Sequence, residues 1–168
     1  MTARRWFSAG AGAGAGAVRI ALAAWVAGLG LAACALEPDV GSRLAGTCSD
    51  ADSNPKTSVS FASDIRPLTL RPGGMGGCGC HLPSATGAGP GTQISGLDLS
   101  SLATLRAGGM NSGTKIVIAG QPCESLLYQK LSESPPFGSR MPLNGPPFFN
   151  PDELALVHDW IAEGANDN

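Results

Sequence analysis

The sequence predicts a mostly α-helical domain in which short helices are joined by long loops rich in Gly and Pro. Four short stretches carry apolar residues at helical spacing, and the 168 residues include 24 Gly and 13 Pro. The β-branched run at 115–118 is too short to found a sheet, so no strand pattern competes with the helices. The hydrophobic content of 43% suffices for a core, and the length indicates one domain.

The first two predicted helices are short and differ in how clearly their ends are marked. The first has Phe61, Ile65 and Leu68 at helical spacing, and Pro67 is expected to limit it to its early turns. The second covers 102–107, because two serines precede it as caps and two glycines follow it as a stop.

The third and fourth predicted helices lie nearer the C-terminus. The third begins near Pro122 and continues through the apolar residues of 126–131. The fourth opens at Asn150 with a cap, a proline and two acidic residues, which suit the positive end of the helix dipole, and it ends at Gly164. Its apolar face consists of Leu154, Val157 and Ile161, with Trp160 beside them.

The N-terminal fifth of the chain has the composition of an export signal. Arg4, Arg5 and Arg19 lie before or within a Gly/Ala-rich run, and the fourteen residues 20–33 carry no charge. This pattern predicts a signal peptide over 1–33, because fourteen residues are too few to span a bilayer as a permanent helix. The two adjacent arginines also partly match a twin-arginine signal, which would export a folded protein.

The apolar segment ends in Leu31-Ala32-Ala33-Cys34, which resembles the lipobox of bacterial lipoproteins. In those proteins the peptide is cut before the cysteine, whose thiol carries lipid, so the resemblance implies lipidation of Cys34. No Asp follows Cys34 directly, which in such lipoproteins implies release to the outer membrane, facing the periplasm or the cell surface. The alternative is an ordinary signal peptide whose small residues happen to precede a cysteine.

The exported chain divides into two predicted parts. Residues 34–58 are rich in Ser, Asp, Asn, Pro and Gly and predict a flexible tether, in which Cys48 is the one sign of local order. Residues 59–168 form the predicted compact domain. Without the signal peptide the chain carries 8 basic and 13 acidic side chains, so it lacks the basic surface that nucleic-acid binding needs. In an oxidising compartment its cysteines are expected to pair or to hold a cofactor.

Cys78-Gly79-Cys80-His81 is the chemical centre of the sequence. A c-type haem is attached by thiols and its iron is bound by an adjacent histidine, usually in a C-x-x-C-H run. In this chain the run is C-x-C-H, and residues two apart on a helix point about 200° apart, so both sulfurs cannot reach one ring edge. Cys80 keeps the usual place beside His81, whereas Gly77 takes the place of the other cysteine. We therefore expect haem c held by a single thioether at Cys80, which would also explain loops too long for an unfilled core.

The residues around this centre resemble planctomycete-type cytochrome c domains. The similarity covers about 59–166, and the matching runs lie at 61–67, 96–99, 105–109, 119–122, 125–128, 140–142 and 160–165. The resemblance implies a cytochrome c fold in which Phe61 on the first helix lies near Trp160 on the last. It also implies that His81 is the proximal ligand and Met141 the distal ligand of the haem iron.

The position of Met141 favours the same assignment. It lies in a loop rich in Gly and Pro, where a thioether has no packing reason to be. His/Met ligation raises the reduction potential and favours electron transfer over oxygen chemistry. The alternative is that Met141 is a loop residue packed under the domain, and Met75 and Met110 are rival donors in Gly-rich loops. His158 on the last helix is expected to be a partly exposed surface residue and not a ligand.

The cysteine count favours a different interpretation. After lipidation of Cys34 four cysteines remain, and an even number in an exported domain suits two disulfides. Cys123 is expected to pair with Cys78 or Cys48. Such pairing favours a stapled domain without a cofactor, and twin-arginine export would also disfavour haem attachment, which acts on unfolded chains.

Three functions from different classes therefore remain open. The first is a lipid-anchored c-type cytochrome that binds haem and exchanges electrons with a redox partner. The second is a disulfide-stapled, haem-less lipoprotein with a binding or structural role. The third is a Cu(I) carrier with the soft ligands Cys78, Cys80, His81 and Met141. No enzyme is expected, because the sequence has no paired acid/base constellation, no G-x-S-x-G or H-E-x-x-H motif and no phosphate loop.

Overall fold

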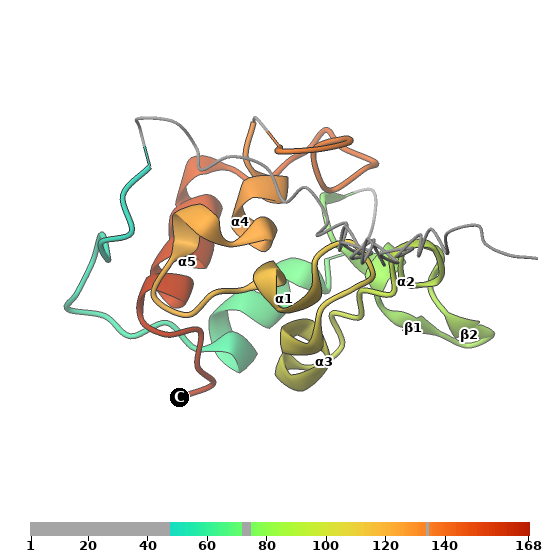
Figure 1. Ribbon diagram of the computed structural model, residues 1–168, viewed down its shortest axis with the longest axis horizontal. Coiled ribbons are helices and arrows are strands. Elements are labelled where there is room, and N and C mark those ends of the chain that lie inside the picture. The colour runs from blue at the N-terminus through green and yellow to red at the C-terminus, as the bar shows by residue number, and fades with distance from the viewer. Residues whose placement is uncertain (1–47, 72–74, 134) are drawn as a thin grey trace, which may run out of the picture. The chain divides into compact units, whose positions relative to one another are not determined.

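The computed structural model describes residues 48–71, 75–133 and 135–168 (Figure 1). The predicted signal peptide over 1–33, the lipidation site Cys34 and the first tether residues 34–47 lie outside the described residues. Within the three described ranges, no helix is long and apolar enough to cross a membrane.

The described domain is rich in short helices, as the sequence predicts. Its α-helices are α1 (Arg66–Thr69), α2 (Pro90–Ser95), α3 (Leu102–Ala107), α4 (Leu126–Leu131) and α5 (Pro151–Ala162). Helical turns of other types lie at Phe61–Ile65, Gly79–His81, Gly113–Ile116 and Pro122–Glu124. The strands β1 (Pro83–Ser84) and β2 (Gly87–Ala88) form an antiparallel hairpin. Helices α3 and α5 confirm the second and fourth predicted helices, whereas α2 and the hairpin were not predicted.

Helix α5 is the longest element, and its start is built as the sequence predicts. The Asn150 side chain accepts a hydrogen bond from the Glu153 N–H at 3.0 Å, and the Glu153 carboxylate accepts one from the Asn150 N–H at 2.9 Å. These bonds satisfy N–H groups that have no partner within the helix. The other Glu153 oxygen forms an ion pair with Arg71 at 2.6 Å. The start of α5 is thereby joined to the segment that follows α1.

The core is centred on Trp160 and Ile161 of α5, which are fully buried. The Phe61 and Trp160 ring centroids lie 5.6 Å apart, so the contact that the sequence resemblance implies is present. The Trp160 indole N–H and the Phe61 N–H both donate to the Asn166 carbonyl, at 2.8 and 3.1 Å. The start of the helical region is thus joined to the segment after α5. The other buried apolar residues are Val59, Ile65, Cys78, Leu99, Leu105, Ile116, Cys123, Leu126, Leu127, Leu131, Phe149, Val157 and Ala165.

Two predicted helices have different boundaries in the structure. Pro67 does not end the first one, because a π-helical turn at Phe61–Ile65 places Pro67 in the first turn of α1, where its missing N–H is tolerated. The predicted third helix is divided at Ser125, whose backbone is extended. The buried Ser125 hydroxyl accepts from the Ile118 N–H at 2.8 Å and donates to the Gln121 carbonyl at 2.9 Å. The Ser125 hydroxyl therefore bonds to backbone groups of the preceding loop, and the helix does not continue through this residue.

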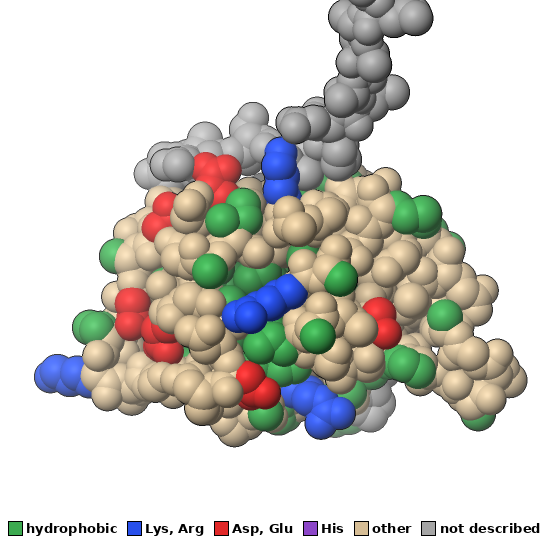
Figure 2. All heavy atoms as spheres, turned by 60° about the horizontal axis from the view of Figure 1, so that its bottom comes forward, with side chains coloured by type: hydrophobic (Ala, Val, Ile, Leu, Met, Phe, Trp, Pro, Cys, Tyr) green, Lys and Arg blue, Asp and Glu red, His purple; other side chains and the backbone are tan. Residues whose placement is uncertain are grey.

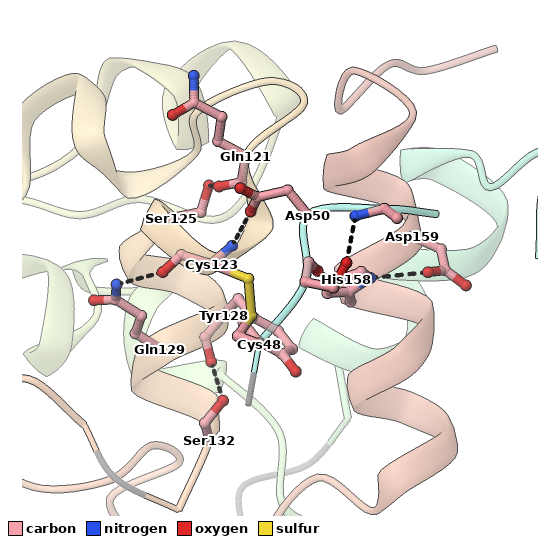
Figure 3. Close-up of a disulfide and its surroundings, with 12 residues drawn as sticks. Cys48, Asp50, Gln121, Cys123, Ser125, Tyr128, Gln129, Ser132, His158 and Asp159 are labelled. Carbon is pink, nitrogen blue, oxygen red and sulfur yellow. Dashed lines mark hydrogen bonds and ion pairs between the residues drawn. A yellow bond between two sulfur atoms is a disulfide. The ribbon is translucent and has the colours of Figure 1, made fainter. Parts of the chain in front are cut away.

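Part of residues 48–58, which the sequence places in the flexible tether, contacts the domain, and Figure 3 shows Cys48 and Asp50 beside Cys123. Cys48 and Cys123 form a disulfide, which is one of the two pairings expected for Cys123. The Ser53 N–H and hydroxyl donate to the two oxygens of the Asp159 carboxylate, at 2.9 and 2.5 Å. The packed part of the domain therefore extends back to Cys48, because these contacts attach the segment to α5 and to the turn before α4.

His158 and Asp159 of α5 hold this N-terminal segment (Figure 3). The His158 ring bonds through Nδ1 to Asp159 Oδ1 at 2.9 Å and through Nε2 to the Ser49 carbonyl at 2.6 Å. The His158 ring therefore joins the Ser49 backbone to α5. The His158 side chain, expected to be partly exposed, is 12% exposed and has a structural role.

Charged side chains are scattered over the face of the molecule that Figure 2 brings forward. Acidic and basic groups lie apart from one another there, and hydrophobic side chains show in a hollow near the middle of the face. The Lys and Arg side chains on this face do not gather into one patch.

Removal of the disulfide should destabilise the domain strongly. The bridge joins residues 75 positions apart, and a loop of that length corresponds to about 4 kcal/mol of stabilisation through the entropy of the unfolded chain. In urea titrations, we expect the free energy of unfolding of the Cys48→Ala/Cys123→Ala double variant to be lower than that of the wild type by about this amount. Cys80→Ala, which removes an exposed free cysteine, is the matched control and should unfold like the wild type. An unchanged midpoint in the double variant would contradict the pairing.

Asp159 should make the stability of the domain depend on pH in acid. Burial alone would raise the pKa of Asp159, but hydrogen bonds from Ser53 and His158 outweigh burial and hold this pKa below its ordinary value. Such a carboxylate stabilises the fold above its unfolded-state pKa of about 4, and the contribution is lost as the pH falls through the folded-state pKa. Urea titrations at a series of pH values should therefore show a fall in stability in acid that Asp159→Asn flattens.

The matched control for this pH dependence is Asp152→Asn, which changes an exposed carboxylate at the start of the same helix. It should keep the acid dependence of the wild type. An Asp159→Asn profile that runs parallel to that of the wild type would show that Asp159 does not carry the effect.

Candidate functional site

A cavity of about 320 Å³ opens between α2, α4 and the loop that follows α4. Its volume lies in the range of cofactor and small-molecule sites, about 300–1,000 Å³, which are typically lined by apolar side chains. The lining includes Cys78, His81 and Met141, three of the four side chains that the sequence singles out for a haem or copper centre. The apolar side chains of the lining are Ile94, Leu97, Leu99, Ile116, Leu126, Leu127, Leu131, Phe137 and Leu143.

His81 is held at the cavity by its turn and by one hydrogen bond. It ends the 3-10 turn Gly79–His81, in which the His81 N–H donates to the Cys78 carbonyl at 2.8 Å. The ring Nδ1 lies 3.2 Å from the Leu97 carbonyl, which only accepts, so Nδ1 carries the proton and Nε2 keeps its lone pair. Among the described residues, none forms a hydrogen bond with Nε2. Histidines that bind metals are commonly fixed in this way by a backbone carbonyl.

Burial keeps the His81 ring neutral. It lowers the pKa of His81 below its ordinary value, and the hydrogen bond to Leu97 opposes this shift. Gly91 of α2 allows the ring to pack closely, because a Cβ at Gly91 would lie 3.0 Å from His81 Cε1. The cavity wall therefore presents a neutral imidazole with an available nitrogen.

Met141 reaches the cavity on the long loop between α4 and α5. Its N–H donates to the Lys130 carbonyl at 2.7 Å, and the neighbouring Arg140 guanidinium donates through Nε to the Leu131 carbonyl at 2.9 Å. Both carbonyls belong to the last turn of α4, so this part of the loop is anchored to the helix. Met141 is half-buried, packs against the hydrophobic core and lines the cavity with His81.

Lys130 is a site residue that the sequence analysis did not identify. It is the one Lys, Arg, Asp or Glu side chain in the cavity lining that the structure describes. Its ammonium group donates to the Phe137 and Ser139 carbonyls, both at 2.6 Å, and lies 4.8 Å from the centroid of the Phe137 ring. Burial lowers the pKa of Lys130. The sequence signal for this residue was a single lysine within the apolar run at 126–131. The hydrogen bonds of Lys130 hold the loop that carries Met141.

The two free cysteines have opposite environments. Cys78 is 7% exposed and lines the cavity, whereas Cys80 is exposed and is not among the lining residues. Burial raises the pKa of the Cys78 thiol to about 11, and the nearby charge of Arg71 opposes the shift. The structure therefore brings Cys78, His81 and Met141 to one cavity and leaves Cys80, which the sequence favours for attachment, at the surface.

Gly77 stands where the usual c-type motif has its first cysteine, and the structure supplies a steric reason. A Cβ at Gly77 would lie 1.6 Å from the Arg71 carbonyl oxygen. Real Cβ atoms do not approach a backbone atom so closely, so a side chain at this position would displace the segment that ends α1.

The other candidate ligands lie away from the cavity. Met75 and Met110 are 62% and 67% exposed and do not line it. Among the described residues, the one group of three His, Cys or carboxylate ligand atoms that come together is that of Cys48, Cys123 and His158, within 4.8 Å of one another. The two sulfurs of this group are joined in the disulfide, so they offer no thiolate to a metal ion.

Comparisons of the chain with protein-family models, with curated proteins and with solved structures found no match.

Substitution of Gly77 should be far more harmful than substitution of its neighbour Gly79. A Cβ at Gly77 meets the Arg71 carbonyl, whereas a Cβ at Gly79 meets nothing within 4 Å. We expect Gly77→Ala to lower the free energy of unfolding by about 1–3 kcal/mol in urea titrations, and Gly79→Ala to leave it nearly unchanged. Equal effects of the two substitutions would show that the close approach at Gly77 does not constrain the fold.

Proposed function

We propose that this chain is an exported, lipid-anchored protein of cytochrome c type, which binds haem in the cavity and transfers electrons. The observation that carries the proposal is that one apolar cavity is lined by both His81 and Met141, although the two residues lie far apart in the sequence. An imidazole nitrogen and a thioether sulfur are the ligand pair of electron-transferring cytochromes c.

The residues of the cavity suit a haem. His81 is neutral and offers Nε2, because Nδ1 is engaged by the Leu97 carbonyl. Met141 is anchored to the end of α4 through its own N–H and through Arg140. The apolar lining suits a large, flat and mostly apolar ring, and it would limit the access of water to a bound iron.

A bound haem would supply reversible one-electron exchange at its iron. His81 and Met141 would ligate that iron, and the apolar side chains would surround it with a medium of low dielectric constant. A thioether ligand and a low dielectric constant both disfavour the extra positive charge of the oxidised form. The residues of the cavity would therefore raise the reduction potential and favour electron transfer.

The location is part of the proposal and is supported by the sequence. The export signal over 1–33 and the lipobox ending in Cys34 would place the domain in the cell envelope, on the outer membrane, where it would meet a redox partner. A disulfide between Cys48 and Cys123 is of the kind that forms in an oxidising compartment, which supports export.

The two alternative functions receive less support from the cysteines. A stapled domain without a cofactor was expected from two disulfides, whereas the described residues contain one and leave Cys78 and Cys80 free. A Cu(I) carrier was expected to use Cys80 together with Cys78, but only Cys78 lines the cavity. Neither alternative accounts for the size and the apolar character of the cavity.

The visible spectrum of the full-length chain, produced in cells that have haem-attachment machinery, tests the proposal. We expect a coloured protein with bound haem. His81→Ala should lose most of the haem, because it removes an iron ligand. Met141→Ala should keep haem and lower the reduction potential by on the order of 0.1 V, because the thioether stabilises reduced iron.

Met110→Ala is the matched control, because it removes an exposed methionine that does not line the cavity. It should leave both the spectrum and the reduction potential unchanged. A colourless wild-type protein would refute the proposal in favour of the stapled domain. Tight Cu(I) binding without haem, weakened by Cys78→Ala and Met141→Ala, would favour the copper carrier.

A further inference from the structure

We propose that Cys78, and not Cys80, is the residue that bonds covalently to the haem, through a single thioether. The inference rests on the proposed function, because it assumes a haem in the cavity. The adjacency of Cys80 and His81 in the sequence suggests that Cys80 bonds to the haem. The structure favours Cys78 instead, because the Cys78 side chain lines the cavity whereas Cys80 is exposed.

The geometry of the turn puts Cys78 and His81 on one face. The His81 N–H donates to the Cys78 carbonyl at 2.8 Å and closes the 3-10 turn Gly79–His81. In a 3-10 turn, side chains three positions apart eclipse each other, whereas side chains two positions apart point about 120° apart. Cys78 and His81 are three positions apart and both line the cavity, and Cys80 points elsewhere and is exposed.

The backbone of Cys80 is held in this orientation by close packing against the start of α2. A Cβ at Gly89 or Gly91 would lie only 2.6 or 2.8 Å from the Cys80 carbonyl oxygen. Turning Cys80 toward the cavity would rotate the whole turn, break this packing and pull the His81 ring from the Leu97 carbonyl. The exposure of Cys80 is therefore a property of the packed turn.

No other cysteine of the described residues is available for a second bond. Cys48 and Cys123 are joined to each other, and Gly77 has no room for a side chain. A single thioether follows, which leaves one of the two haem vinyl groups unchanged.

The covalent step is the addition of a thiol to a vinyl group. The sulfur of Cys78 bonds to one vinyl carbon, the thiol hydrogen moves to the other, and the carbon–carbon double bond becomes a single bond. All atoms of the thiol and the vinyl group are kept, so the addition needs no further oxidant or reductant.

The test compares Cys78→Ala with Cys80→Ala in the full-length chain, produced with haem-attachment machinery. Non-covalent haem is extracted with acidified solvent, and mass spectrometry of the unfolded protein then reports covalent attachment independently of electron transfer. We expect one haem adduct in the wild type and in Cys80→Ala, and no adduct in Cys78→Ala. Peptide mass spectrometry of the wild type should locate the haem on Cys78.

Two further measurements report the number of thioether bonds in the wild type and the folding of the Cys78→Ala variant. The pyridine haemochrome band of the wild type should lie to the red of a protein with two thioethers, because one vinyl group remains. Extractable haem and an intact Cys48–Cys123 disulfide in Cys78→Ala should show that this variant folds and lacks only the covalent bond.

The possible failures separate the inference from the proposed function. A haem adduct on Cys80, two thioethers, or haem that is bound but wholly extractable from the wild type would overturn the assignment of Cys78 and leave the proposed function standing. A wild-type protein that contains no haem would overturn both.

Discussion

Hydrogen bonds from side chains to backbone groups hold this domain together, because its helices are too short to satisfy the backbone by themselves. Buried peptide groups outside helices and strands need partners. Ser125 supplies them for the loop before α4, and Trp160 supplies one for the segment after α5. The buried Gln129 donates to the Cys123 carbonyl at 2.7 Å, and Lys130 and Arg140 bond to carbonyls of the loop after α4 and of α4 itself.

The candidate site is built from the same kind of contact. The Leu97 carbonyl orients the His81 ring, and bonds between α4 and the loop after it position Met141. Neither candidate ligand residue depends on a long helix or on a sheet for its position. The walls of the cavity are therefore set before a ligand arrives, which lowers the conformational entropy that a ligand must remove on binding.

The segment at 48–58 is attached to the domain although its composition predicts flexibility. Residues 48–58 have few large apolar side chains, yet one disulfide and two hydrogen bonds to Asp159 hold them on the domain. Further hydrogen bonds join His158 to the Ser49 carbonyl and the Cys123 N–H to the Asp50 carboxylate. Composition measures the apolar surface that a segment can bury, and these attachments are covalent or polar, so composition does not report them.

The sequence by itself determined the features that arise within one or two turns of the chain. The ends of α3 and α5 follow from caps and glycines, and the candidate ligands His81 and Met141 follow from short motifs. Only the tertiary structure decided that Cys123 pairs with Cys48, that Ser125 divides a helix, and that Cys78 faces the cavity while Cys80 does not. The physical reason is that capping and turn preferences act between neighbouring residues, whereas a disulfide, a buried hydroxyl and the wall of a cavity depend on which distant segments meet.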